Sequence, residues 1–364
     1  MNRDAFSARL AAIRPADAAA MDAARRRQAQ LAKPPGSLGK LEDISIQLAG
    51  ITGHIYNEIE KTRICVLAAD NGVVAEGVSS APQSVTRQQA INLTRGVTGA
   101  SAIAHHFGDE LVVVDVGIAE DYTCPQIVNR RIARGTKNIA KEPAMTVQQA
   151  LTALDTGMTL AAQAKRDGVQ ALGVGEMGIG NTTTSAAVLM ALTGCAVEDA
   201  VGRGGGVTEE AFARKRAVVA GALERLRPDA GDAVDVLAKV GGFDLAAMAG
   251  VFLGAAESRL PVVIDGFISV TAALCAVRLC PAARDFLFPS HGSFERGYAV
   301  AAQALSLTPV LTLDMRLGEG SGCPLGFRVL EAACAAMNGM ATFEDARIDD
   351  GYLAPIRAKD CFTV

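Results

Sequence analysis

Short apolar runs that alternate with longer segments of helical pattern constrain the fold of this chain more than any other feature. The runs lie at residues 63–70, 111–117, 169–174, 261–266, 286–291 and 309–314. Apolar runs of this length between helical segments are typical of strands buried on both faces. The alternation therefore predicts an α/β fold, with a mostly parallel six-stranded Rossmann-like sheet covered by helices on both faces.

The N-terminal part of the chain lacks this alternation. Residues 1–32 are rich in Ala and Arg at helical spacing. The segment Lys33-Pro-Pro-Gly-Ser-Leu-Gly-Lys40 is typical of a rigid connector, and another helical segment follows it. We therefore expect residues 1–60 to form a helical appendage and residues 61–334 to form an α/β catalytic domain.

The composition excludes several classes of protein. The 364 residues carry a net charge of −4, without the basic patch of a nucleic-acid-binding protein or a membrane-surface protein. No apolar span has the length of a membrane helix. The eight cysteines include no C-x-x-C pair, and the four histidines do not cluster with them at ligand spacing. We expect reduced thiols, no metal site and a cytoplasmic protein.

A glycine-rich stretch, residues 173–184, follows the third apolar run. Its glycines allow a sharp turn and a close approach of the backbone to a ligand. Asn181 and the threonines 182–184 are suited to cap a helix over residues 185–192. A turn that leads into a helix N-terminus predicts an anion site, because free N–H groups and the helix dipole point at the same place. Glu176 stands inside this turn, and a phosphate site does not need an acid, so Glu176 indicates chemistry.

Polar residues end most of the predicted strands, where ligands of open α/β sheets bind. They are Asp70, Asp115, Glu176, Asp265, Ser290 and Glu319. We assign the three aspartates to turns, caps or nearby N–H groups, and Asp244 to a helix N-cap. Glu caps helices less well than Asp or Ser, and both glutamates lie inside glycine-rich turns. Glu176 and Glu319 are therefore the candidate catalytic residues.

Two further segments are compatible with a nucleotide ligand. Gly202-Arg-Gly-Gly-Gly206 precedes a basic helix that contains Lys215, and a glycine nest beside a lysine suits a phosphate. The alternative is a flexible link followed by a solvated lysine. The stretch Ser290-His-Gly-Ser-Phe-Glu295 fits either a Ser/His nucleophile site, or a structural hydrogen bond at His291 and a helix N-cap at Ser293.

The segment Gly173-Val-Gly-Glu-Met-Gly178 also matches the dinucleotide-binding fingerprint, with an acid at Glu198 about 20 residues further on. It lies in the third strand unit and not in the first, and it carries Glu176 in the turn. An NAD-dependent oxidoreductase is therefore an alternative function, and a non-catalytic nucleotide-binding protein is another.

Taken together, the motifs resemble those of the nicotinate-nucleotide–dimethylbenzimidazole phosphoribosyltransferases. The matching segments follow the family's order at 33–39, 69–78, 115–118, 173–183, 240–245, 263–267, 290–295 and 316–322. The resemblance implies transfer of phosphoribose from nicotinate mononucleotide to 5,6-dimethylbenzimidazole, which forms α-ribazole 5′-phosphate and nicotinate for the nucleotide loop of cobalamin. It also implies a homodimer that needs no cofactor, and a helical domain that the residues from about 335 to 364 join.

The resemblance implies a role for residues in each matching motif. Glu319 corresponds to the general base and Glu176 to the second active-site acid. The residues expected around the phosphate and ribose are Gly178, Gly202, Lys215 and Ser293. The residues expected around the attacking base are Gln89, Met177 and Leu317.

The sequence departs from the family pattern at three places. Asn71 stands where the family commonly has His, Ala81 stands where it often has Ser, and Gly205-Gly206 replaces the usual Thr-Gly. The first two positions line or adjoin the pocket for the attacking base, so they bear on which base is preferred. Neither candidate glutamate is altered.

Overall fold

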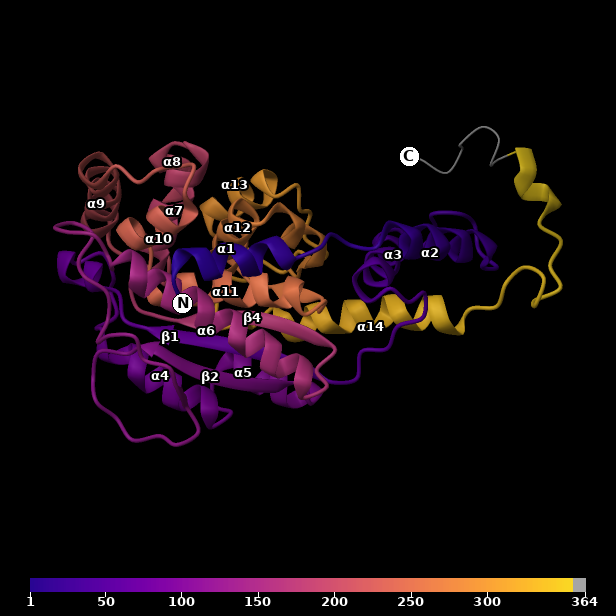
Figure 1. Ribbon diagram of the computed structural model, residues 1–364, viewed down its shortest axis with the longest axis horizontal. Helices are drawn as coiled ribbons and strands as arrows, with labels where there is room; N and C mark the ends of the chain where they lie inside the picture. Colours follow the sequence, from indigo (N-terminus) through magenta and orange to yellow (C-terminus); the bar gives the residue numbers. More distant parts are fainter. Residues whose placement is uncertain (356–364) are drawn as a thin grey trace. The chain divides into compact units, whose positions relative to one another are not determined.

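The computed structural model describes residues 1–355, and its chain forms two compact units (Figure 1). The first unit comprises Met1–Arg14 and Lys61–Gly326, and the second comprises Pro15–Glu60 together with the chain from Phe327. This grouping differs from the expected boundaries, because the first helix belongs with the α/β unit. The division into folding domains stays a prediction. Residues 356–364, which include Cys361 and the end of the segment expected to join the appendage, lie outside the described residues.

A six-stranded parallel sheet forms the centre of the first unit and confirms the predicted fold class. The strands are β1 (Thr62–Ala69), β2 (Glu110–Gly117), β3 (Val128–Asn129), β4 (Ala171–Met177), β5 (Val262–Ile264) and β6 (Leu287–Pro289). Their order across the sheet is β3-β2-β1-β4-β5-β6. The order reverses between β1 and β4, and the carboxyl ends of strands at such a switch point border a crevice that suits a ligand.

One edge of the sheet differs from our prediction. The run at 309–314 contributes only an isolated bridge between Leu311 and His291, and β3 completes the sheet at the opposite edge. Pro309 has no N–H to donate, and Asp314 has a φ of +51°, a left-handed conformation that does not continue a strand. The prediction of a strand at 309–314 is therefore wrong.

Helices pack on the sheet: α11 lies above β1 and β2 in Figure 1, and α4 also contacts these two strands. The α-helices of the first unit are α1 (Arg3–Ala12), α4 (Ser84–Thr94), α5 (Gly99–Phe107), α6 (Val147–Arg166), α7 (Asn181–Thr193), α8 (Val197–Ala200), α9 (Glu209–Leu226), α10 (Ala233–Val240), α11 (Phe243–Glu257), α12 (Phe267–Leu279) and α13 (Arg296–Ala304). Short 3-10 turns lie at Gly72–Glu76, Pro281–Phe286 and Gly351–Leu353. Helix α6 begins with a capping box formed by Thr146 and Gln149.

Helix α11 is the most deeply buried helix among those of the first unit. Its residues from Phe243 to Ala256 are all buried, and it packs on β1, β2, β4 and α6. Gly254 lies so close to α6 that an added Cβ would come within 2.6 Å of the Met158 Cα. This contact, which only a glycine permits, holds α11 firmly and places its N-terminus at the carboxyl ends of the central strands.

Helices at the carboxyl edge begin differently from our prediction. Helix α7 starts directly after Gly180, whose φ of +92° turns the chain without any side-chain cap. Gly242 precedes α11, so Asp244 lies in the first turn and is not the N-cap. Helix α13 starts after Glu295, so Ser293 is not an N-cap either. The polar side chains that we assigned to capping are therefore available for other partners.

The second unit contains α2 (Ala18–Gln30), α3 (Lys40–Thr52) and the later part of α14 (Cys323–Gly339), which begins in the first unit. Its core cluster joins Ala24, Ala49 and Met337, one residue from each helix. Lys33 in the connector pairs with Glu42 at 2.6 Å, and both side chains are largely buried. The unit is thus built from segments that are far apart in the sequence.

Candidate active site

A cavity of about 230 Å³ opens at the carboxyl ends of β4 and β5. Its walls come from residues 78–81, 176–182, 203–207, 265–269 and 316–319, together with Lys215, His291, Ser293 and Glu295. The cavity therefore collects three of the six polar residues that the sequence placed at strand ends, namely Glu176, Asp265 and Glu319.

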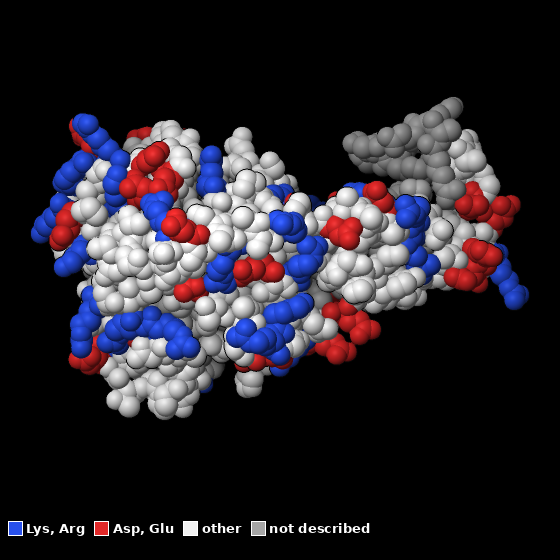
Figure 2. All heavy atoms as spheres, in the orientation of Figure 1, with Lys and Arg blue, Asp and Glu red and all other residues white. Residues whose placement is uncertain are grey.

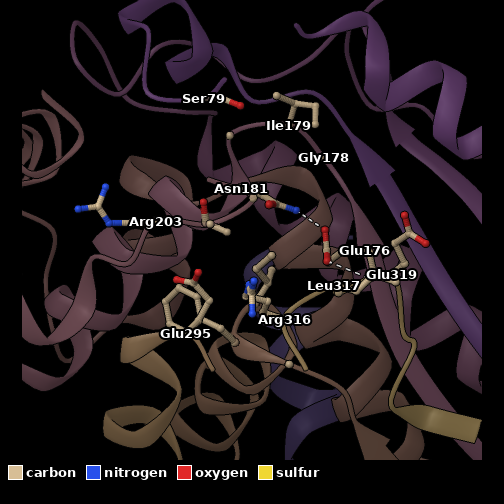
Figure 3. A pocket seen from close by; sticks show the side chains of 18 of the residues that line it. Ser79, Glu176, Gly178, Ile179, Asn181, Arg203, Glu295, Arg316, Leu317 and Glu319 are labelled. Carbon is tan, nitrogen blue, oxygen red and sulfur yellow. Dashed lines mark hydrogen bonds between the residues drawn. The ribbon is translucent and has the colours of Figure 1, made fainter. Parts of the chain in front are cut away.

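Glu176 is the penultimate residue of β4 and is buried in the cavity wall. One carboxylate oxygen, Oε1, accepts the backbone N–H of Glu319 at 3.3 Å, and Oε2 accepts the side-chain amide of Asn181 (Figure 3). Burial, together with the nearby charges of Asp244 and Asp265, raises the pKa of Glu176 to about 8 against the effect of these hydrogen bonds. Glu176 is therefore largely protonated at neutral pH in the empty cavity.

Glu319 lies opposite, in the turn between the 309–314 run and α14. Its φ is +61°, and Gly318 and Gly320 on either side are also left-handed, with φ of +82° and +83°. The Gln89 amide donates to Oε1 of Glu319 at 2.9 Å. The other oxygen, Oε2, is buried and has no hydrogen-bond partner among the described residues. An unpaired buried carboxylate oxygen is costly, so this atom, like Glu295 Oε2 in the same cavity wall, lacks a donor that a ligand could supply.

The backbone of β4 touches the Glu319 turn. A Cβ added at Gly175 would lie 2.6 Å from the Glu319 carbonyl carbon, so only glycine fits there. On the other side, Asp265 follows β5 and accepts the backbone N–H groups of Gly320 at 3.0 Å and Gly322 at 2.7 Å. The two neighbouring strands thus hold the turn from both sides.

Lys215 of α9 is buried, with 1% of its surface exposed. Its Nζ donates to Thr182 Oγ1 at 2.8 Å and to the Gly202 carbonyl at 3.0 Å. Burial lowers the pKa of Lys215 to about 8, although the charge of Glu295 opposes this shift. A buried ammonium beside the N-terminus of α7 and a glycine loop provides a site for a phosphate.

The structure brings nearly all of the predicted site residues to this cavity. Met177, Gly178, Lys215, Ser293 and Leu317 line it with the two glutamates. Gln89 is not part of the lining but contacts Glu319, and Gly202 lines an adjoining hollow while its carbonyl holds Lys215. The roles of these residues stay predictions.

The departures from the family pattern occupy different positions. Ala81 lines the cavity. Asn71 is fully buried, with its amide 3.4 Å from Asp244 Oδ2 and its oxygen 3.3 Å from the Thr184 hydroxyl, and it is not part of the lining. Burial raises the pKa of Asp244 to about 6. Asn71 thus belongs to a buried polar network behind the cavity.

Several residues of the site were not identified from the sequence. Asn181 pairs with Glu176, and Glu295 and Arg316 line the cavity, where the Arg316 guanidinium lies 5.5 Å from the centre of the Phe294 ring. Each lies inside one of the motif segments, which was the available signal. Within residues 1–355, no group of acidic, His and Cys side chains has the arrangement of a metal site.

His291 is buried beside Ser290, whose hydroxyl lies 2.7 Å from the Ile264 carbonyl and 3.1 Å from His291 Nδ1. The hydroxyl must donate to the carbonyl, so Nδ1 donates to the hydroxyl. Burial lowers the pKa of His291, which is therefore neutral at neutral pH. This pairing leaves the Ser290 hydroxyl without a base, which argues against a Ser/His nucleophile site.

Comparison with known proteins shows the family of the chain. A family model described as phosphoribosyltransferase matches residues 13–348. A nicotinate-nucleotide–dimethylbenzimidazole phosphoribosyltransferase of Clostridium perfringens is 52% identical over 341 residues, which cover 94% of each chain. The enzyme of the same name from Acetivibrio thermocellus is 50% identical over 90% of this chain and 94% of the relative.

A solved structure is similarly close. The crystal structure of nicotinate-nucleotide–dimethylbenzimidazole phosphoribosyltransferase from Thermus thermophilus superposes with a TM-score of 0.87 at 42% identity. The match covers 92% of this chain and the whole of that one. On its sequence and its fold, the chain belongs to the nicotinate-nucleotide–dimethylbenzimidazole phosphoribosyltransferase family.

Proposed function

We propose that this protein transfers the phosphoribosyl group of nicotinate mononucleotide to 5,6-dimethylbenzimidazole, which forms α-ribazole 5′-phosphate and nicotinate. The observation that carries the proposal is the unpaired, buried Oε2 of Glu319 in a cavity that also contains Glu176 and Lys215. An acceptor without a donor suits a substrate that brings an N–H group, as an azole does. Family membership supports the same reaction.

The phosphate of the nucleotide binds at Lys215, Thr182 and the N-terminus of α7. This assignment rests on the buried ammonium and on Gly204 and Gly206, which are left-handed with φ of +57° and +104° and so orient backbone N–H groups in a loop. Binding energy gained at the phosphate positions the ribose C1′ for reaction.

The bond changes at C1′ are balanced without a metal or an added acid. The bond from C1′ to the pyridinium nitrogen breaks, and its electron pair stays on that nitrogen, so nicotinate leaves without protonation. A nitrogen of the benzimidazole attacks C1′ from the opposite face, which inverts the configuration. Glu319 Oε2 takes the proton from the other ring nitrogen as the new bond forms.

Glu176 acts on the ribose side of the reaction. Its carboxyl group lies in the cavity wall beside the Glu319 turn. Positive charge on the pyridinium and then on C1′ favours the ionised form of this carboxyl group, and the anion in turn stabilises the transition state. The raised pKa of the empty site therefore falls when the nucleotide binds.

The test is incubation with nicotinate mononucleotide and a panel of benzimidazoles, purines and phenols, with nicotinate and the new nucleotide measured by mass spectrometry. The panel also reports the preference for the attacking base. We expect Glu319→Gln to lower turnover about 10²- to 10⁴-fold, because the amide cannot accept the proton. Glu224→Gln, on the exposed face of α9, is the control and should keep full turnover.

Other outcomes would favour other functions. Release of no nicotinate, despite binding of the nucleotide, would support a non-catalytic nucleotide-binding protein. A change in NADH fluorescence on mixing would support an oxidoreductase. Near-normal turnover of Glu319→Gln would remove Glu319 as the base.

Its cysteines and its surface charge bear on where the enzyme acts and with which partners. Seven described cysteines are free thiols, which is consistent with a reducing cytoplasm. No helix among residues 1–355 is apolar over a length that would cross a membrane. Acidic and basic side chains are interspersed on the face shown in Figure 2, which is unlike a nucleic-acid footprint. A homodimer follows from the resemblance, and light scattering of the purified protein would test it.

A further inference from the structure

Asp265 occupies an unusual position for an aspartate that ends a strand. It is 1% exposed, and it follows β5 directly. Each of its carboxylate oxygens accepts a backbone N–H from a segment more than 50 residues away in the sequence, Oδ2 from Gly320 and Oδ1 from Gly322. The carboxyl group therefore stabilises the turn that carries Glu319, in addition to its own loop.

The turn at residues 318–320 must be stabilised by contacts with other segments. Gly318, Glu319 and Gly320 are consecutive left-handed residues, and a left-handed glutamate is disfavoured by its Cβ. Such a conformation persists only where the surroundings determine it. The surroundings here are Asp265 on one side and the Glu176 carboxyl group, which accepts the Glu319 N–H, on the other.

An Asp–His pair would be the other explanation of a buried aspartate at this place. His291 Nδ1 lies 4.0 Å from Asp265 Oδ1, beyond hydrogen-bond distance, and is bonded to Ser290 instead. The short contacts of Asp265 go to the turn. Asp265 thus acts on the site mechanically, through the backbone of residues 320–322, in addition to the effect of its charge on the pKa of Glu176.

We propose that Asp265 is a positioning residue, which clamps the turn so that Glu319 Oε2 faces the attacking azole. The inference rests on the proposed function, because its effect is measured in that reaction. It assigns to Asp265 a role in turnover and none in holding the nucleotide.

The principal variant is Asp265→Asn, because the amide keeps the size of the side chain but has only one accepting oxygen. We expect kcat to fall roughly 10- to 100-fold, as small displacements of a reacting group do, with KM and Kd for nicotinate mononucleotide changed less than about twofold. Asp265→Glu is a second variant that keeps the charge while its extra methylene displaces both oxygens. It should lose kcat in the same selective way, and it can be used if the amide variant does not fold.

The matched control is Asp115→Asn. Asp115 is a buried aspartate near the end of β2, where Oδ1 accepts the N–H groups of Gly117 at 2.9 Å and Ile118 at 2.8 Å, but it does not line the cavity. Its amide variant should keep wild-type kcat once the melting temperatures show that it is folded. A loss of kcat equal to that of Asp265→Asn would mean that both variants act through general destabilisation and would overturn the proposal.

A double-mutant cycle with Glu319→Gln separates positioning from an independent role. If Asp265 acts through Glu319, then Asp265→Asn should change the residual rate of Glu319→Gln less than about twofold. If the two substitutions instead lowered the rate by independent factors that multiply, the proposal would be overturned. An unchanged kcat in both Asp265 variants would also overturn it. If the wild-type protein released no nicotinate with any acceptor, the proposed function itself would fail, which is a distinguishable result.

Discussion

Opposing effects determine the ionisation of Glu176, and a bound substrate can change their balance. Burial raises its pKa to about 8, while Asn181 and the Glu319 N–H donate to its carboxylate and favour the charged form. In the empty site at about pH 7 the protonated form prevails. A pyridinium ring placed beside the carboxyl group would lower the pKa, so we expect nicotinate mononucleotide to release a proton from Glu176 as it binds.

Isothermal titration in buffers of different ionisation enthalpy measures this release. Binding to the wild-type protein near neutral pH should release close to one proton more than binding to Glu176→Gln. The proton that belongs to the nucleotide phosphate is common to both and cancels. Equal proton release by the two proteins would show that binding of the nucleotide does not change the ionisation of Glu176, which would contradict this prediction.

Lys215 gives rise to a second prediction about pH, because its pKa is shifted in the opposite direction. Burial lowers its pKa to about 8, so it carries its charge below that pH and loses it above. The KM for nicotinate mononucleotide should therefore rise as pH increases above about 8, whereas below that pH the ionisation of Glu176 lets KM fall as pH increases, and kcat changes little. Lys215→Ala should raise KM at least about tenfold below pH 8 and remove the rise above it, because a charge-assisted hydrogen bond is lost. A rise in KM above pH 8 that persists in the variant would have to come from another group.

At the scale of elements, the site depends on the contact between β4 and the Glu319 turn. Gly175 allows that contact, since a Cβ there would meet the backbone of Glu319 and Gly320. Gly175→Ala should displace the turn and lower kcat about 100-fold, by the same reasoning as a displacement of about 1 Å of the reacting group. Gly221→Ala is the matched control, because Gly221 lies within α9 and a Cβ there would meet nothing within 4 Å.

The control substitution should keep full turnover and slightly raise the melting temperature, because alanine is the better helix former. Turnover of Gly175→Ala within about threefold of wild type would contradict the view that the turn must be placed closely for reaction. The assay is the nicotinate release described above.

The sequence predicts which segments of this chain form strands and helices better than it predicts which segments pair with one another. Five of the strands follow from apolar runs, because burial on both faces leaves a signal that is local in the chain. The run at 309–314 also contains apolar residues, yet it does not pair as a strand. Pro309 and the turn that follows the run prevent the pairing. The two-residue β3 is too short to give a periodic signal.

The same limit applies to the site. Glu176 and Glu319 could be found because glutamates inside glycine-rich turns are unexpected locally. Asp265 was assigned to nearby N–H groups, and the N–H groups that it holds lie in a different segment. Asn181 was assigned to a helix cap, whereas Gly180 begins the helix and frees the amide for Glu176. Such pairings are set by tertiary structure, and a single sequence does not record them.

At the scale of the whole molecule, the residues expected to carry out the reaction are separate from the second unit. Every residue that lines the cavity belongs to the first unit, whereas the core of the second joins Ala24, Ala49 and Met337 from three helices. Met337 is 1% exposed, and its replacement by alanine should leave a cavity that costs about 2–5 kcal/mol of stability within that unit. We therefore expect Met337→Ala to lower a calorimetric unfolding transition while kcat at room temperature stays within about twofold of wild type. Met340→Ala, at a partly exposed methionine of the same unit, should leave the thermogram nearly unchanged. A parallel loss of kcat in Met337→Ala would mean that the second unit shapes the active site, and the separation of the two units would then be wrong.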